Sequence, residues 1–522
     1  MSDNFIRDRL PPPDRQPDFL FELPELLYPE RLHAAVELVD RQDPEALAVV
    51  NDAGAWTYGE MKDLSDRIAR LLVEREGLVP GNRVLLRGPN GAMLFASWLG
   101  VLKAGGIVVA TMPMLRPREI ATILERARIS HAIVDARFRA DFDAAGGTCS
   151  VLSYEGDTGF PALEDVAPGF TPVATHRDDV ALVAFTSGTT GKPKGCVHYH
   201  RDILAPADSF ARHVLKPRPG DRWACSAPIA FTFGLGMLLI FPWRFGGTAV
   251  TIETPGPQPL LDAIERHRVT TLATAPTAYK AMLPMLAGRG TSSLRTCVSA
   301  GEHLPAATWQ AWREATGIGI VDGIGATEMM HVFISAAGDA IRPGATGKAV
   351  PGYVATILDE GGAAMAAGTG RLAVKGPTGC RYFDDERQAD YVQHGWNVTG
   401  DTYRKDEDGY FWYVARSDDM IISSGYNIGA PEVENALYAH PAVQECAVVG
   451  ALCPERGQKV KAFVVLAPGY APDAAMVALL QDHVKAAIAP YKYPREVEFV
   501  DALPKTATGK LQRFALRQNP SP

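Results

Sequence analysis

The stretch Thr186-Ser-Gly-Thr-Thr-Gly-Lys-Pro-Lys-Gly195 has the composition of a phosphate-binding loop, and its residue types do not suit a helix or a strand. It follows a short apolar run, residues 181–185, that reads as a buried strand. Glycines let a backbone approach an anion closely, and successive amide groups form an anion-binding concavity. The hydroxyl groups add donors, and Lys192 and Lys194 add positive charge. We therefore expect this loop to hold phosphate groups.

The loop differs from a Walker loop, because Gly188 and Gly191 are three residues apart and Pro193 follows Lys192. A flexible surface loop rich in Gly and Thr is the alternative that composition by itself leaves open. The preceding strand and the density of donors favour phosphate binding over that alternative.

Alternating helices and strands must position this loop. Helical apolar spacing predicts helices at 58–76, 93–103, 118–128, 259–267, 278–286 and 305–316, and short apolar runs predict strands at 83–87, 107–111, 131–134, 248–252, 270–275 and 294–299. This alternation indicates largely parallel sheets covered by helices, which bind ligands beyond the carboxyl ends of their strands. Ser299-Ala-Gly-Glu302 and Asp322-Gly-Ile-Gly-Ala-Thr-Glu328 each follow a predicted strand. We expect both segments to line one crevice with the phosphate loop.

The chain changes character near residue 340. Gly and Pro become frequent up to about residue 415, and runs such as 371–375 and 410–414 suggest antiparallel strands of a small barrel-like subdomain. After the polar break at Ser417-Asp-Asp419, helices at 431–438 and 476–487 and strands at 447–450, 460–466 and 497–500 predict a small α+β unit. We therefore expect an N-terminal domain of residues 1–416 and a C-terminal domain of residues 417–522, in a fold of mixed α/β and α+β class.

Length and composition exclude several classes of protein. A chain of 522 residues is too long for one core, and 47% hydrophobic with 21% charged residues is typical of a globular protein. The net charge of −8 gives no electrostatic reason to expect nucleic acid. The seven scattered cysteines form no C-x-x-C pair, which favours reduced thiols over disulfides or zinc. Since no signal peptide or membrane-spanning run is evident, we expect a cytoplasmic protein without a membrane partner.

Five motifs together resemble the adenylate-forming (acyl-CoA synthetase) superfamily, and the resemblance covers nearly the whole chain. They are the phosphate loop, Gly323-Ile-Gly-Ala-Thr-Glu328, Thr399-Gly-Asp401, Arg416-Ser-Asp-Asp-Met-Ile-Ile-Ser-Ser-Gly-Tyr-Asn-Ile428 and Pro504-Lys-Thr-Ala-Thr-Gly-Lys510. Five motifs in the family's order are far more specific than one. One departure is that Gly325 stands where the family usually carries an aromatic residue.

The resemblance implies ATP-dependent activation of a carboxylate, followed by transfer of the acyl group to coenzyme A. Lys510 would bridge the carboxylate and the α-phosphate, Glu328 and Thr189 would hold Mg²⁺, Asp418 would be the hinge of a mobile C-terminal domain, and Ser424, Gly425 and Tyr426 would line the CoA channel. The remaining ATP-binding residues implied are Thr186, Ser187, Gly188, Thr190, Lys192, Ala300, Gly301, Glu302, Asp322, Gly323, Thr327, Asp401, Tyr413 and Arg416. No Cys stands in an obvious Cys–His arrangement, so we expect the acyl-accepting thiol to be external.

The residues that indicate which acid is bound are Pro228-Ile-Ala-Phe-Thr-Phe-Gly-Leu235 and His331. Phe231 replaces a His that is usual in the family, and this aromatic segment is similar to that of the benzoate-CoA ligase subgroup, where a Tyr commonly stands in place of Phe233. The continuation of the phosphate loop to Asp202 resembles the 2-aminobenzoate-CoA ligase branch. We expect Phe231, Phe233, Gly325 and His331 to contact a small aromatic acid, since aromatic faces favour a flat ring.

Three functions remain open at this point. The first is an AMP-forming aryl-CoA ligase for benzoate or 2-aminobenzoate, acting as a monomer or homodimer. The second is a stand-alone adenylating enzyme that loads a carrier protein, although no carrier-like serine segment is visible. The third is a nucleotide-binding regulator on the same scaffold, which the presence of Lys510, Glu328 and Asp401 disfavours.

Overall fold

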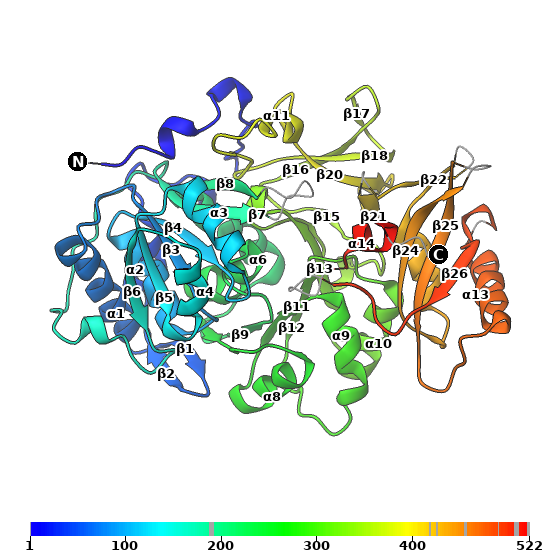
Figure 1. Ribbon diagram of the computed structural model, residues 1–522, viewed down its shortest axis with the longest axis horizontal. Helices are drawn as coiled ribbons and strands as arrows, with labels where there is room; N and C mark the ends of the chain where they lie inside the picture. Colours follow the sequence, from blue (N-terminus) through cyan, green and yellow to red (C-terminus); the bar gives the residue numbers. More distant parts are fainter. Residues whose placement is uncertain are drawn as a thin grey trace.

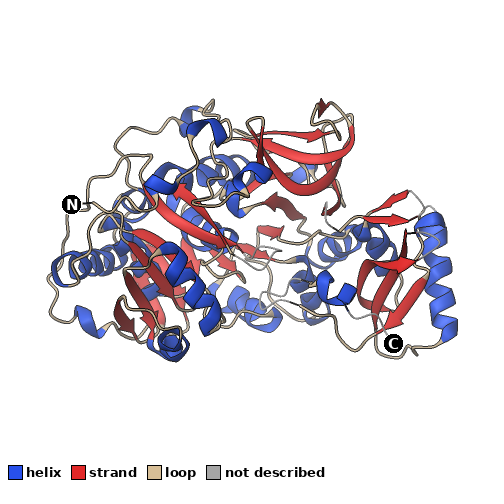
Figure 2. Cartoon of the chain, turned by 45° about the horizontal axis from the view of Figure 1, so that its top comes forward, coloured by secondary structure: helices blue, strands red, loops and turns tan. Residues whose placement is uncertain are grey.

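The computed structural model describes residues 2–186, 193–416, 419–423, 426–453, 457–488, 490–505 and 511–518. These residues form four sheets, three from the chain up to residue 416 and a fourth from the chain after residue 420 (Figure 1). Helices lie against the sheets at the left and right of Figure 2, whereas the sheet at the upper right has few helices beside it. The predicted combination of α/β and α+β architecture is confirmed.

The first sheet has the strand order β6-β5-β3-β4-β7-β8 and is parallel except for β8. The strands are β3 (Arg83–Arg87), β4 (Ile107–Thr111), β5 (His131–Asp135), β6 (Ser150–Tyr154), β7 (Val180–Thr186) and β8 (Lys194–Tyr199). The helices of this part are α1 (Tyr58–Arg70), α2 (Ala92–Lys103), α3 (Pro117–Ala127), α4 (Arg139–Ala144) and α5 (His200–Pro206). Thr57 and Glu60 form a reciprocal capping box that begins α1 at the predicted residue.

The second sheet runs β15-β14-β13-β12-β11-β9-β10-β1-β2, with β2, β14 and β15 antiparallel to their neighbours. Its strands are β1 (Leu47–Asn51), β2 (Gly54–Thr57), β9 (Arg222–Cys225), β10 (Thr248–Val250), β11 (Thr271–Thr274), β12 (Thr296–Ala300), β13 (Ile320–Gly325), β14 (Val332–Ser335) and β15 (Lys348–Ala349). Its helices are α6 (Thr232–Leu235), α7 (Phe241–Arg244), α8 (Pro257–His267), α9 (Pro276–Met282) and α10 (Ala306–Thr316). The helix predicted at 278–286 therefore begins and ends earlier, and a 3₁₀ turn (Leu283–Met285) follows it.

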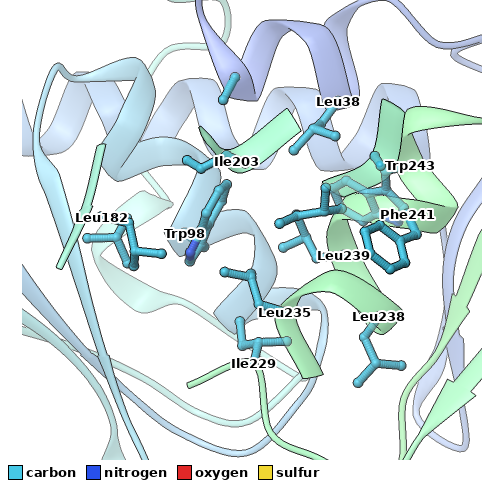
Figure 3. Close-up of a cluster of buried hydrophobic side chains, with 14 of the residues drawn as sticks. Leu38, Trp98, Leu182, Ile203, Ile229, Leu235, Leu238, Leu239, Phe241 and Trp243 are labelled. Atoms are coloured by element: carbon cyan, nitrogen blue, oxygen red, sulfur yellow. The ribbon is translucent and has the colours of Figure 1, made fainter. Parts of the chain in front are cut away.

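One hydrophobic core joins these two sheets. All twelve residues of α2 are buried. A helix that is buried on every side must lie between two packed layers. Figure 3 shows Trp98 of α2 facing Leu239, Phe241 and Trp243 from the segment around α7, with Leu182 of β7 and Ile203 of α5 beside it. The apolar stretch 234–241 is thus core of the N-terminal part.

The third sheet is antiparallel, with the order β17-β16-β18-β20-β19 and β21 paired to β20. Its strands are β16 (Val354–Leu358), β17 (Ala364–Met365), β18 (Gly368–Lys375), β19 (Val392–Gln393), β20 (Trp396–Lys405) and β21 (Phe411–Arg416), and the short α11 (Gln388–Tyr391) precedes β19. It corresponds to the antiparallel strands expected where Gly and Pro become frequent.

The fourth sheet has the order β23-β22-β25-β24, with β26 parallel to β25. Its strands are β22 (Ile421–Ser423), β23 (Tyr426–Ile428), β24 (Val443–Cys453), β25 (Gly457–Leu466) and β26 (Glu496–Phe499), with helices α12 (Ala430–Tyr438), α13 (Ala474–Ala487) and α14 (Arg513–Gln518). It lies beside α9 and α10 in Figure 1. Lys280 of α9 donates a hydrogen bond to the carbonyl of Gln444 in β24 at 2.7 Å. Among the described residues, no helix is long and apolar enough to cross a membrane.

Candidate active site

The phosphate loop is the connection of a β-hairpin. β7 and β8 pair in antiparallel register, with Thr186 opposite Lys194 and Phe185 opposite Gly195. The prediction that the whole stretch lies outside regular structure was therefore wrong at its two ends, because pairing with β7 holds Lys194 and Gly195 in a strand that no local apolar pattern marks. The Thr186 hydroxyl is shielded from solvent and has no hydrogen-bond partner among the described residues.

Lys194 connects this hairpin to Glu328. Its ammonium group lies 4.0 Å from Oε1 of Glu328 and 4.7 Å from the ring centroid of Tyr382. The Tyr382 hydroxyl donates a hydrogen bond to the same carboxylate oxygen. Burial raises the pKa of Glu328, while Tyr382 and Lys194 act in the opposite direction. A carboxylate from one sheet and a cation from the other thus meet at the phosphate hairpin.

Glu328 and His331 lie on opposite sides of a tight turn. Glu328 lies in a 3₁₀ turn (Thr327–Met329), and Met330 then adopts a left-handed conformation with φ of 65° before β14 begins. That conformation is unfavourable for a residue with a side chain and persists where surrounding structure holds it. Gly325 precedes the turn, and a Cβ there would lie 2.7 Å from the carbonyl oxygen of His331. Because the backbone at His331 comes this close to Gly325, there is no room for an aromatic side chain at this position.

His331 is buried in a cluster of aromatic rings. Its ring centroid lies 4.5 Å from that of Phe241, 5.7 Å from that of Phe210 and 5.6 Å from that of Phe233. Burial lowers the pKa of His331 to about 3, so the imidazole is neutral near pH 7. Its Nδ1 is shielded from solvent and has no hydrogen-bond partner in the described part of the chain. Phe231 and Phe233, at the start of α6, keep part of their surface exposed.

The predicted nucleoside-binding residues lie on β20 and β21. Asp401 and Arg416 are directly opposite in the register of these strands, and the guanidinium lies 3.4 Å from Oδ1 of Asp401. Tyr413, also on β21, stacks against His303 with ring centroids 5.7 Å apart. His303 accepts a hydrogen bond at 3.0 Å from the amide of Asn435 in α12. An aromatic wall therefore stands beside a carboxylate suited to ribose hydroxyls, and it contacts the unit that follows residue 420.

Asp322 and Gly323 lie beside the last residues of β12. The parallel register of β12 and β13 pairs Ser299 with Asp322 and Ala300 with Gly323. Asp322 is half-buried, and its Oδ1 is shielded from solvent without a hydrogen-bond partner among described residues. This desolvation raises the pKa of Asp322 to about 7. Gly301, with φ of 91°, turns the chain out of the sheet toward Glu302.

Several expected site residues lie outside the described part of the chain. They are Ser187, Gly188, Thr189, Thr190, Lys192, Asp418, Ser424, Gly425 and Lys510, and the side chain of Tyr426 is not described either. The roles expected for these residues stay predictions.

Three residues of the site were not assigned from the sequence. Tyr382 and His303 carry no local signal, because a lone aromatic residue is far more often core, although His303 directly follows Glu302 of a predicted segment. Lys194 was recognised only as a positive charge of the loop. The cysteines include one arrangement that the sequence did not suggest: Cys196 and His198 lie two residues apart on β8, and therefore on one face of the strand. Both are completely buried, so this thiol is not exposed to a substrate.

The donor set around Glu328 suits Mg²⁺ held together with ATP. Mg²⁺ in such sites takes one or two protein carboxylates and completes its coordination with phosphate oxygens and water. The contacts from Tyr382 and Lys194 both fall on Oε1, and no side chain in the described ranges hydrogen-bonds or ion-pairs with Oε2. Within those ranges no cluster of three or more His, Cys, Asp or Glu side chains could hold a metal by itself.

Comparison with known proteins agrees with this geometry. The family model of the AMP-binding enzyme matches residues 36–382, and that of the AMP-binding enzyme C-terminal domain matches residues 432–510. The chain therefore belongs to the AMP-binding enzymes and is an AMP-forming acid–CoA ligase. Within that family it groups with the benzoate-CoA ligases and their relatives.

Three relatives illustrate what this chain is similar to. A benzoate–CoA ligase of Thauera aromatica is 38% identical over 514 residues, covering 95% of this chain and 97% of the relative. A crystal structure of the anthranilate CoA ligase AuaEII in complex with anthranoyl-AMP is 35% identical, with a TM-score of 0.90 and coverage of 95% and 98%. A mitochondrial acyl-coenzyme A synthetase, ACSM3 of Mus musculus, is 33% identical, covering 89% of this chain and 84% of the relative.

Proposed function

We propose that this enzyme activates a small aromatic carboxylic acid of the benzoate or 2-aminobenzoate type and transfers it to coenzyme A. The observation that carries the proposal is the turn from Thr327 to His331, which joins a carboxylate at the phosphate hairpin to a neutral ring inside an aromatic cluster. ATP chemistry and acid recognition would therefore occur on two sides of one turn.

In the first half-reaction, a carboxylate oxygen of the acid attacks the α-phosphorus of ATP, and pyrophosphate leaves as the bond to the β-phosphate breaks. Negative charge gathers at the phosphates, so donors and cations stabilise this step. Lys194 and the hairpin would supply part of that positive charge, and Glu328 would hold Mg²⁺, which when bound neutralises phosphate charge. Lys510 would contact the carboxylate and the α-phosphate, while Asp401 and Tyr413 would hold ribose and adenine.

In the second half-reaction, the thiol of coenzyme A attacks the acyl carbon, AMP leaves with the electron pair of the broken anhydride bond, and the thiol proton is released. The burial of Cys196 supports an external thiol as the acceptor. Ser424, Gly425 and Tyr426 would line its channel.

A site beside this aromatic cluster would suit a flat, uncharged ring. The aromatic side chains around His331 offer stacking and edge contacts of about 0.5–1.5 kcal/mol per pair. Because the imidazole of His331 is neutral, it would not form an ion pair with the carboxylate of the acid. It would instead pack against the aryl ring or form a hydrogen bond with an amino substituent. The similarity to the benzoate–CoA ligase and to AuaEII supports the same acids.

Pyrophosphate release across a panel of acids tests the proposal. We expect benzoate and 2-aminobenzoate to exceed hexanoate and octanoate by about 100-fold or more in kcat/KM, because several ring contacts would be lost with a flexible chain. Phenylacetate and hydroxybenzoates should fall between. Preference for the fatty acids would reject the aromatic pocket, and activity with a holo-carrier protein but not with CoA would reject the proposed acceptor.

Substitution of Gly236 by alanine should weaken acid binding. A Cβ at Gly236 would lie 2.3 Å from Cδ2 of His331, so the ring must move out of its aromatic cluster. Overpacking of this kind costs about 1–3 kcal/mol. Returning the ring to the acid at this cost would raise the KM for the acid by about 5- to 150-fold. The KM for CoA should change little in the same steady-state assay.

The matched control for this variant is Gly159→Ala, because a Cβ there meets no atom within 4 Å. It should leave both KM values unchanged. An unaltered KM for the acid in folded Gly236→Ala enzyme would contradict the placement of His331 at the acid.

A further inference from the structure

Tyr382 lies in a segment that the main chain holds tightly against the phosphate hairpin. The amide of Val197 in β8 donates to the carbonyl of Arg381 at 2.9 Å, and the amide of Phe383 donates to the carbonyl of Gly195 at 3.2 Å. The amide of Tyr382 itself donates to the side chain of Gln388 at 2.9 Å. Residues next to Tyr382 therefore act as a further strand beside β8, and the position of the phenol ring is fixed from both sides.

The phenol group of Tyr382 is buried, with 1% of the residue exposed. A buried tyrosine hydroxyl usually forms a hydrogen bond. The partner of Tyr382 is Glu328, 54 residues earlier in the chain, in the turn between β13 and β14. The bond thus joins the segment beside the hairpin to the turn that carries the carboxylate.

The two contacts on Glu328 orient its carboxylate. Tyr382 and Lys194 both reach Oε1, and Lys194 also lies over the face of the Tyr382 ring. With Oε1 held from one side, rotation of the carboxylate is restricted, and no described side chain competes with an ion for Oε2. Groups that orient a metal ligand in this way typically change metal affinity by 10- to 100-fold when removed.

We infer that Tyr382 is a positioning residue, which fixes Glu328 so that its second oxygen binds the Mg²⁺ of Mg²⁺–ATP. The inference rests on the proposed function only in taking Glu328 as the Mg²⁺ ligand. In this role Tyr382 would act through Glu328, its hydrogen-bond partner.

The test measures nucleotide binding without turnover. An ATP analogue with a methylene group between the α- and β-phosphates is titrated into the full-length enzyme by calorimetry, once with Mg²⁺ and once with EDTA. The readout is the factor by which Mg²⁺ tightens binding. We expect Tyr382→Phe to reduce this factor about 10-fold or more, with the affinity in EDTA unchanged.

Tyr391→Phe is the matched control. Tyr391 packs edge-on against Tyr382 with ring centroids 6.0 Å apart, is similarly buried, and has no hydrogen-bond partner for its hydroxyl among the described residues. Its substitution should leave the Mg²⁺ factor as in the wild type. In a Glu328→Gln background, Tyr382→Phe should have no further effect, because the two residues would act as one unit.

Two results would overturn the inference. One is an unchanged Mg²⁺ factor in Tyr382→Phe, and the other is an equal loss of affinity with Mg²⁺ and with EDTA, as a merely structural role predicts. Circular dichroism checks the fold, and Tyr382→Met, which also lacks a donor, replaces the Phe variant if that chain does not fold. The titration contains neither acid nor CoA, so its failure is distinct from failure of the acid panel.

Discussion

Enzyme in which Lys510 is replaced by alanine should lose acid-dependent ATP–pyrophosphate exchange by about 10²- to 10³-fold, the usual cost of removing one group that stabilises transition-state charge. Lys510 is expected to bridge the carboxylate and the α-phosphate, both of which carry charge when they approach. Formation of the thioester from supplied aroyl-adenylate and CoA should persist within about threefold, since this step involves no attack at phosphorus. Radiolabelled pyrophosphate exchange and a thioester assay measure the two steps separately.

Lys505→Ala is the control for this substitution. Lys505 lies five residues earlier and forms an ion pair with Glu445 at 2.7 Å, with both side chains one-third exposed. Such pairs contribute little, so both half-reactions should stay near the wild-type rate. Loss of both half-reactions in folded Lys510→Ala enzyme would contradict the assigned role.

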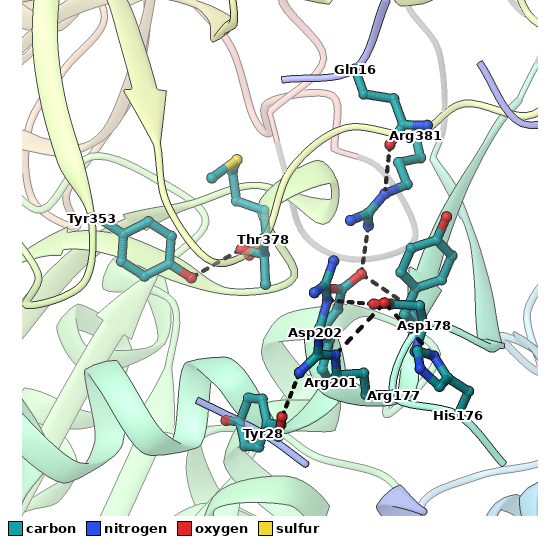
Figure 4. A network of polar contacts seen from close by, with 12 residues as sticks. Gln16, Tyr28, His176, Arg177, Asp178, Arg201, Asp202, Tyr353, Thr378 and Arg381 are labelled. Carbon is teal, nitrogen blue, oxygen red and sulfur yellow. Dashed lines mark hydrogen bonds and ion pairs between the residues drawn. The ribbon is translucent and has the colours of Figure 1, made fainter. Parts of the chain in front are cut away.

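Replacement of Arg381 by methionine should lower the free energy of unfolding by about 3–5 kcal/mol, because the buried carboxylate of Asp202 then keeps only Arg201, 3.9 Å away, as a cationic neighbour. The two side chains are completely buried and 2.6 Å apart, and the guanidinium lies 4.1 Å from the ring centroids of both Phe19 and Tyr199. Figure 4 shows Arg381 between Gln16 and Asp202, with Asp178 and Arg201 nearby. Urea titration followed by tryptophan fluorescence measures the change.

The contrasting pair is Arg266 and Asp52, whose side chains are 59% and 73% exposed. Arg266→Met should cost less than about 1 kcal/mol. The double variant Arg381→Met, Asp202→Asn should be less destabilised than the sum of the two single variants, because neither charge is then left alone. Additive losses would show that the pair does not act as a unit.

The elements that the sequence predicted well have a strong local pattern. The runs at 83–87 and 107–111 are strands β3 and β4 at those same residues, since a central parallel strand is apolar on both faces. β8 was not predicted, because Lys194–Tyr199 mixes charged, small and aromatic residues. Its burial, including that of His198, depends on β7 and on the segment around Tyr382, which lie elsewhere in the chain.

The site residues also differ in how well the sequence predicted them. Glu328, Asp401 and Arg416 stand in short motifs that can be recognised in the sequence. The structure places Glu328 in the turn after β13, Asp401 within β20 and Arg416 at the end of β21. Tyr382 and His303 do not stand in any recognisable sequence motif. Their contacts with Glu328, Tyr413 and Asn435 bridge 54, 110 and 132 residues, so only the folded chain brings them together.

The sequence by itself determined the nucleotide chemistry, because a phosphate loop and the residues that follow strand ends are local features that need only their immediate neighbours. It also indicated an aromatic acid through Phe231, Phe233 and His331. Only the tertiary structure decided that the phosphate loop closes a hairpin, that Glu328 is held by Tyr382 and Lys194, and that His331 is a neutral ring inside an aromatic cluster. These features depend on burial and on contacts between distant segments, which no single stretch of sequence encodes.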